Sequence, residues 1–165
     1  MIPDPVKWLI AFLAALVLQT SFVPAISLGN ATPDLLLIVL FFFSLKYGVM
    51  PGIFVGFFLG LGQDLYSPSL LGQNALVKTL TGAFIGLFNE RVMRTDPLVK
   101  TVLLIVVFIV HDALFMAVQV LKLHDSLGSL FSGLFFRTLP RALYSVAVAA
   151  LFYLWEMIPK PSVRK

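Results

Sequence analysis

The chain has 165 residues, of which 59% are hydrophobic and only 12% are charged, and its mean hydropathy is +0.99. Soluble domains carry about 25% charged residues, so this composition excludes an ordinary soluble enzyme and indicates a polytopic membrane protein. The formal net charge of +4 does not point to nucleic acid, because the basic residues stand beside apolar segments. The sequence has no cysteine, which excludes disulfides, thiol catalysis and zinc–thiolate sites.

Apolar segments separated by short polar stretches predict an all-α protein, a six-helix transmembrane bundle that forms one integral membrane domain over residues 1–165. The expected spans are 6–26, 33–47, 50–65, 72–88, 99–120 and 134–157. A cleaved signal peptide is the alternative for the first span, but that span is long and no A-x-A motif follows it.

The apolar run from Leu35 to Leu61 is too long for one span of about 30 Å and short for two. We therefore expect two short helices joined by a hairpin at 46–49, with a single kinked helix as the alternative. The turn before them predicts Thr32 as the N-cap, Pro33 as the first helical residue and Asp34 in the first turn.

The basic residues predict the orientation, because cytoplasmic loops are enriched in Lys and Arg. With both termini in the cytoplasm, the outer loops contain only Lys122. The inner side then has the basic residues of the inner loops, tails and adjoining span ends, namely Lys7, Lys46, Arg91, Arg94, Lys100, Lys160, Arg164 and Lys165. The expected topology therefore has both termini in the cytoplasm, with the basic tail anchored to anionic lipid.

Away from the ends of the expected spans, four charged residues fall inside them, and the helix rise places three of these in one slab about 9 to 12 Å below the outer surface. These three are Lys78, Asp112 and Arg141, while Arg137 lies one turn closer to that surface. Because an unpaired charge at this depth is costly, we expect an intramembrane polar cluster. It has three possible roles: a structural ion pair, basic residues that reach the headgroups, or a pocket for a partner or anionic ligand. His111 beside Asp112 most simply hydrogen-bonds a neighbour.

Glycine recurs every four residues in the third span, which creates a smooth stripe against which another helix can pack closely. We predict that Gly52, Gly56 and Gly60 bind a partner helix, and that Asp64 and Asn74 in the following outer turn extend this partner-binding site. The alternative is structural: the glycines pack helices within the chain, Asp64 accepts backbone N–H groups after its helix ends, and Asn74 caps the next helix.

The sequence contains none of the motifs G-x-S-x-G, H-E-x-x-H or Walker A, and no close pair of carboxylates. We therefore expect a protein that is not an enzyme and has no cofactor and no metal site.

Three segments resemble the rod shape-determining protein MreD family: P-D-L-L-L-I at 33–38, G-F-F-L-G-L-G-Q-D-L at 56–65 and S-L-L-G-Q-N-A-L at 69–76. The later segments 82–86 and 139–143 also fit, so the resemblance covers most of the chain. The chain departs from the family pattern at Ser145, where members often have Asn, and at Gln63, where many have a charged or aliphatic residue.

The resemblance implies a non-enzymatic scaffold in the inner (cytoplasmic) membrane, part of the bacterial cell-elongation machinery, which controls cell shape and peptidoglycan synthesis. Its partners would be MreC directly, and MreB, RodA and its penicillin-binding transpeptidase indirectly. The family fold is similar to the six-helix substrate-binding subunits of energy-coupling-factor transporters. This similarity leaves an alternative open, a subunit that captures a small ligand or lipid-linked precursor near Lys78, Asp112 and Arg141.

Overall fold

The computed structural model describes residues 4–23, 33–67, 71–89 and 97–123, together with 144 and 147. The helices in these ranges are α1 (Asp4–Ser21), α2 (Leu35–Tyr47), α3 (Val49–Asp64), α4 (Gln73–Leu87) and α5 (Pro97–Leu123). They overlap the first five expected spans. The expected sixth span lies outside the described residues, except for the helical positions Tyr144 and Ala147.

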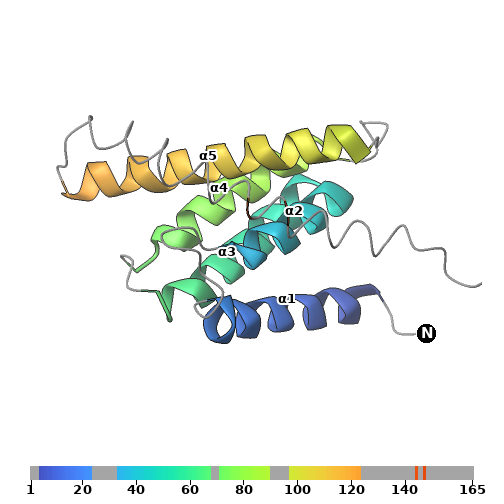
Figure 1. Cartoon of the computed structure of the whole chain (residues 1–165), viewed down its shortest axis with the longest axis horizontal. Helices are drawn as coiled ribbons and strands as arrows, with labels where there is room; N and C mark the ends of the chain where they lie inside the picture. Colours follow the sequence, from blue (N-terminus) through green and yellow to red (C-terminus); the bar gives the residue numbers. More distant parts are fainter. Residues whose placement is uncertain are drawn as a thin grey trace, which may run out of the picture.

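Successive helices run in opposite directions, with α2, α3 and α4 between α1 on one side and α5 on the other (Figure 1). One end of the bundle, here named the Gly48 end, holds the start of α1, the α2–α3 turn and the end of α4. The opposite end, here named the Asp64 end, holds the ends of α1 and α3 and the starts of α2 and α4. Adjacent helices therefore reverse direction at alternate ends, as the hairpin prediction requires.

The segment Val99–Leu121 of α5 is long and apolar enough to cross a membrane, whereas α2 and α3 are shorter apolar helices. Helix α2 is the centre of the core, because Leu37, Leu40 and Phe41 are almost completely buried. Leu36 and Leu45 on the same helix are equally inaccessible. A helix that is buried on nearly all sides has no need for an amphipathic pattern, which explains its uniformly apolar sequence.

Gly48 separates α2 from α3 and has a φ of +91°, a conformation that costs glycine little and other residues much more. The prediction of two short helices is confirmed, and the single kinked helix is excluded by this break. The predicted helix start is wrong by two residues: Asp34, and not Thr32, is the N-cap of α2, and Pro33 precedes the helix. Asp34 caps the helix because its carboxylate accepts a hydrogen bond from the Leu37 backbone N–H at 2.9 Å.

The glycine stripe of α3 lies directly against α4. A Cβ atom added to Gly56 would be 2.4 Å from the Lys78 carbonyl oxygen, and one added to Gly60 would be 2.3 Å from the Ala75 Cα. On the opposing helix, a Cβ atom at Gly82 would be 2.3 Å from the Gly52 carbonyl oxygen. The two backbones are therefore in contact along the length of the pair, the small-residue packing typical of membrane helices.

The Gly48 end carries charged and aromatic side chains. Asp4 pairs with Lys7 at 3.1 Å and with Lys46 at 3.6 Å. The hydrogen bond from Lys7 and the nearby charge of Lys46 hold the pKa of the Asp4 carboxyl below its usual range. Trp8 packs edge-on against Tyr47, with ring centroids 6.1 Å apart. Basic and aromatic residues together at one end of a bundle are typical of the boundary between membrane and water.

Candidate functional site: a buried polar network

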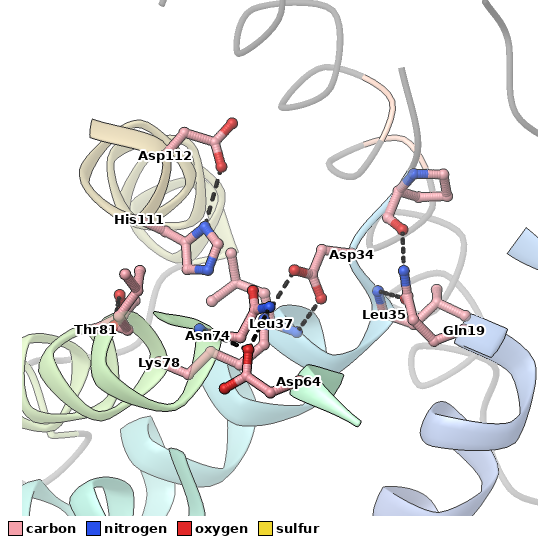
Figure 2. A network of polar contacts seen from close by, with 12 residues as sticks. Gln19, Asp34, Leu35, Leu37, Asp64, Asn74, Lys78, Thr81, His111 and Asp112 are labelled. Carbon is pink, nitrogen blue, oxygen red and sulfur yellow. Dashed lines mark hydrogen bonds and ion pairs between the residues drawn. The ribbon is translucent and has the colours of Figure 1, made fainter. Parts of the chain in front are cut away.

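The Asp64 end of the bundle contains most of the buried polar side chains in the described part of the chain (Figure 2). They come from the start of α2, the end of α3, the first half of α4 and the middle of α5.

Asp34 uses its two carboxylate oxygens for two tasks. Oδ1 caps α2 by accepting the Leu37 N–H, and Oδ2 accepts a hydrogen bond from the Lys78 ammonium at 2.8 Å. Both side chains have no exposed surface. A charge in such an environment is tolerated only when it is paired, so this ion pair fixes the start of α2 against the middle of α4.

Asp64 forms a second cap, at the point where α3 ends and α4 begins. Its carboxylate accepts the backbone N–H groups of Gly72, Asn74 and Ala75, each at 3.0 Å, and also the side-chain amide of Asn74 at 2.9 Å. The first turn of a helix has unpaired N–H groups and a partial positive charge, and a carboxylate there satisfies both. Asp64 is only 4% exposed, so the cap is a buried part of the structure.

Two glutamines attach the flanking helices to this network. The Gln19 amide of α1 donates to the Pro33 carbonyl at 3.1 Å and accepts the Leu35 N–H at 2.8 Å. The Gln73 amide of α4 donates to the Phe115 carbonyl of α5 at 3.0 Å. Side-chain hydrogen bonds to the backbone thus connect α1 to α2 and α4 to α5 at the same end of the molecule.

His111 and Asp112 bring the middle of α5 into the same region. His111 Nδ1 lies 3.0 Å from the Asp112 carboxylate, and the two residues are 1% and 5% exposed. His111 Nε2 is buried and has no hydrogen-bond partner among the described residues. In Figure 2 the His111 ring lies on the side of α5 that faces the Asp34–Lys78 pair.

Among the described residues, the structure gives Lys78 a partner that the predicted intramembrane cluster did not include. Lys78 pairs with Asp34, for which the sequence predicts only a place in a helix first turn. Asp112 is hydrogen-bonded to His111. Arg137 and Arg141 lie outside the described residues. A signal for the Asp34–Lys78 pair was present, since the second and fourth expected spans both start at the outer surface.

The predicted partner-binding residues divide into two groups. Gly52, Gly56 and Gly60 contact α4 of the same chain, which favours the alternative that they pack helices within the chain. Asp64 and Asn74 are bonded to each other, and Asp64 has the role of accepting backbone N–H groups. Asn74 does not have the alternative role of capping α4: the N-cap position is Gly72, with a φ of +86° and no side-chain cap, and the Asp64 carboxylate accepts the first N–H groups of the helix instead.

The polar network connects neighbouring helices through an ion pair and hydrogen bonds. The carboxylate oxygens of Asp34 and Asp64 are occupied by an ammonium group or by helix N–H groups. Among the described residues no group of three or more His, Cys, Asp or Glu side chains is arranged to hold a metal ion. The arrangement holds α2, α3, α4 and α5 in fixed register.

Comparison with known proteins supplies the biological context. Residues 4–158 match the family model of the rod shape-determining protein MreD, which is nearly the whole chain. Proteins of this family are non-catalytic membrane proteins with a role in determining the shape of rod-shaped cells. Neither the curated proteins nor the solved structures gave a match. The extent of the family match, together with the apolar helical bundle, shows that the chain belongs to the MreD family.

Proposed function

We propose that this chain is a membrane scaffold of the bacterial cell-elongation machinery, which binds MreC and through it helps to control where peptidoglycan is made. MreB, RodA and its penicillin-binding transpeptidase would be reached through MreC. The observation that carries the proposal is the family match over residues 4–158. The buried polar network supports the proposal, because it holds the helices in place and a scaffold must present a fixed surface to its partner.

The topology belongs to the same proposal: six helices in the inner membrane, with both termini and the Gly48 end in the cytoplasm. Lys7 and Lys46 lie at the Gly48 end, and Lys100 follows the start of α5 there. The Asp64 end then faces outward. This assignment satisfies the enrichment of basic residues in cytoplasmic loops.

A partner helix on the glycine stripe would have to displace α4, so we place the MreC contact on the opposite, exposed face of α3. Met50, Phe54 and Phe58 project there at intervals of four residues and are 61% to 69% exposed. Aromatic residues and Met are enriched where protein surfaces associate. Large side chains in register on one helix face can interlock with a second helix.

Co-purification with tagged MreC from native membranes tests this surface. Phe54→Ala together with Phe58→Ala should weaken MreC recovery at least about tenfold, the loss typical of central interface residues. Leu13→Ala on α1 is the matched control, because Leu13 is 58% exposed, similar to Phe54 at 61%. Equal recovery of MreC with the double variant and the control would remove α3 from the interface, and failure of the native chain to recover MreC would refute the proposal.

The alternative, capture of a ligand beside Lys78 and Asp112, is not favoured by the geometry. Lys78 is completely buried and bonded to Asp34, and Asp112 is 5% exposed. In the described part of the chain these charges are enclosed by packed helices. A role in holding the scaffold together accounts for them more simply.

A further inference from the structure

Two lysines share one carboxylate at the Gly48 end, where α1 starts and α2 ends (Figure 1). The Lys7 ammonium lies 3.1 Å from Oδ1 of Asp4, and the Lys46 ammonium lies 3.6 Å from Oδ2. The three side chains are 46% to 59% exposed, so a ligand can reach all of them. Of the acidic residues that the structure describes, only Asp4 lies at this end. Two ammonium groups against one carboxylate leave one positive charge in excess.

Both lysines keep hydrogen-bonding capacity for an anion. An ammonium group has three N–H donors, and Lys7 uses one of them for Asp4. Lys46 approaches Asp4 only at ion-pair distance. Exposed ion pairs are weak because water screens them, so a second anion can contact the lysines without breaking a strong interaction.

An aromatic cluster lies on the bilayer side of these charges, between α1 and α2. Trp8 and Phe12 stand one and two helical turns after Asp4 on α1. The Phe43 ring of α2 contacts both, with centroid distances of 5.3 Å, and the Tyr47 ring lies 4.7 Å from Phe43. The first three rings are half-buried and Tyr47 is 37% exposed, so the contact between the two helices leaves aromatic surface uncovered.

Positive charge beside exposed aromatic rings selects an amphiphile with an anionic head. Phosphate oxygens accept strong, charge-assisted hydrogen bonds from ammonium groups, and Trp and Tyr favour the headgroup level of a membrane. A soluble anion would use the lysines and leave the rings uncovered. A phospholipid can place its phosphate against Lys7 and Lys46 and its upper acyl chain against Trp8 and Phe43. A zwitterionic lipid carries its own cation, which the excess positive charge repels, so the complementary ligand is an anionic phospholipid.

We propose that the start of α1 and the end of α2 form a binding site for one anionic phospholipid, whose phosphate contacts Lys7 and Lys46. Asp4 is a positioning residue, because it holds the two ammonium groups on one carboxylate. The inference rests on the proposed function only in that the Gly48 end is placed in the cytoplasm, which assigns the lipid to the inner leaflet. The site itself is the same in either orientation.

Trp8 can report the bound lipid directly. The sequence has two tryptophans, so Trp155→Phe leaves Trp8 as the single fluorophore. The full chain is reconstituted in mixed vesicles in which either phosphatidylglycerol or phosphatidylcholine carries bromine on its acyl chains, which quenches tryptophan on close approach. One basic residue near anionic lipid contributes about a fivefold factor, so phosphatidylglycerol should occupy the site at least about fivefold more than phosphatidylcholine at equal mole fraction. Equal quenching by the two lipids would overturn the proposal.

Single substitutions separate a defined site from diffuse positive charge. Lys7→Gln and Lys46→Gln should each reduce the preference about fivefold, whereas Lys46→Arg should retain it. Lys100→Gln is the matched control, because it removes one basic residue from the same end but on α5, which lies on the opposite side of the bundle from α1 (Figure 1). An unchanged preference in both glutamine variants of the site, or an equal loss in Lys100→Gln, would overturn the proposal.

Glycerol phosphate distinguishes a lipid from a soluble anion. An excess in the buffer should leave the quenching by brominated phosphatidylglycerol unchanged, and loss of the quenching would show that the site takes the soluble headgroup and overturn the lipid assignment. If Trp155→Phe fails to fold, native mass spectrometry of the native chain in detergent decides. Phosphatidylglycerol adducts should then outnumber phosphatidylcholine adducts, and equal numbers would overturn the site.

MreC recovery separates this inference from the proposed function. If the native chain prefers the anionic lipid but fails to recover MreC, the scaffold proposal falls and the lipid site stands. If it recovers MreC without a lipid preference, the lipid site falls and the scaffold stands.

Discussion

The ammonium nitrogen of Lys78 lies 2.8 Å from Oδ2 of Asp34, and neither side chain has any exposed surface. The pair joins residues 44 positions apart in the sequence. Because the other oxygen of Asp34 caps α2, one carboxylate determines both where α2 begins and how it sits against α4. Removal of either partner therefore affects two helices at once.

Lys78→Met should destabilise the chain strongly, because Asp34 would keep a buried charge without its ammonium partner. Loss of one member of a buried pair costs about 3–5 kcal/mol. The double variant Asp34→Asn, Lys78→Met removes both charges while the introduced asparagine can still cap α2, so it should recover much of the loss. Thermal unfolding in detergent measures both effects. A double variant no more stable than Lys78→Met alone would show that the two charges do not compensate each other.

Asp64→Ala should destabilise the α3–α4 junction by about 2 kcal/mol or more, since the cap holds three backbone N–H groups and one amide. Asp64→Asn should be intermediate, because one of its two acceptor oxygens becomes a donor. Tyr66→Phe in the same turn is the control, as Tyr66 is 68% exposed. Hydrogen exchange at the start of α4 is the local measurement, and unchanged protection in Asp64→Ala would contradict the capping role.

Residue patterns predicted the helices better than they predicted the polar contacts. Long apolar runs and glycine spacing are local signals, so the α2–α3 break and the close-packing face of α3 could be read from the sequence. The N-cap of α2 could not, because Thr32 and Asp34 are both good caps and only the three-dimensional path of the chain selects one.

The Asp34–Lys78 pair was missed for a physical reason. The position of Asp34 before an apolar run indicates only a helix start, yet a carboxylate has two oxygens and can cap the helix and pair with Lys78 at the same time.

Gly56→Ala should destabilise the α3–α4 pair by about 1–3 kcal/mol, the range for overpacking, since the added methyl would meet the Lys78 backbone carbonyl and the two helices would have to separate. Gly62→Ala is the matched control on the same helix. Its added methyl would meet only the Leu16 side chain, which can move, and alanine favours the helix. Thermal unfolding of the two variants gives the comparison, and equal stability would mean that α4 is not held against the glycine stripe.

Single cysteines provide a direct test of orientation, because the native chain has none and every labelled protein reports one site. Leu71→Cys at the Asp64 end is suitable because Leu71 is 78% exposed, and Tyr47→Cys at the Gly48 end because Tyr47 is 37% exposed. A thiol reagent that cannot cross the inner membrane should label the first in intact cells whose outer layers admit it. It should label the second only after the inner membrane is opened, since Lys7 and Lys46 mark that end as cytoplasmic. The opposite labelling pattern would invert the proposed topology and place the Asp64 end in the cytoplasm.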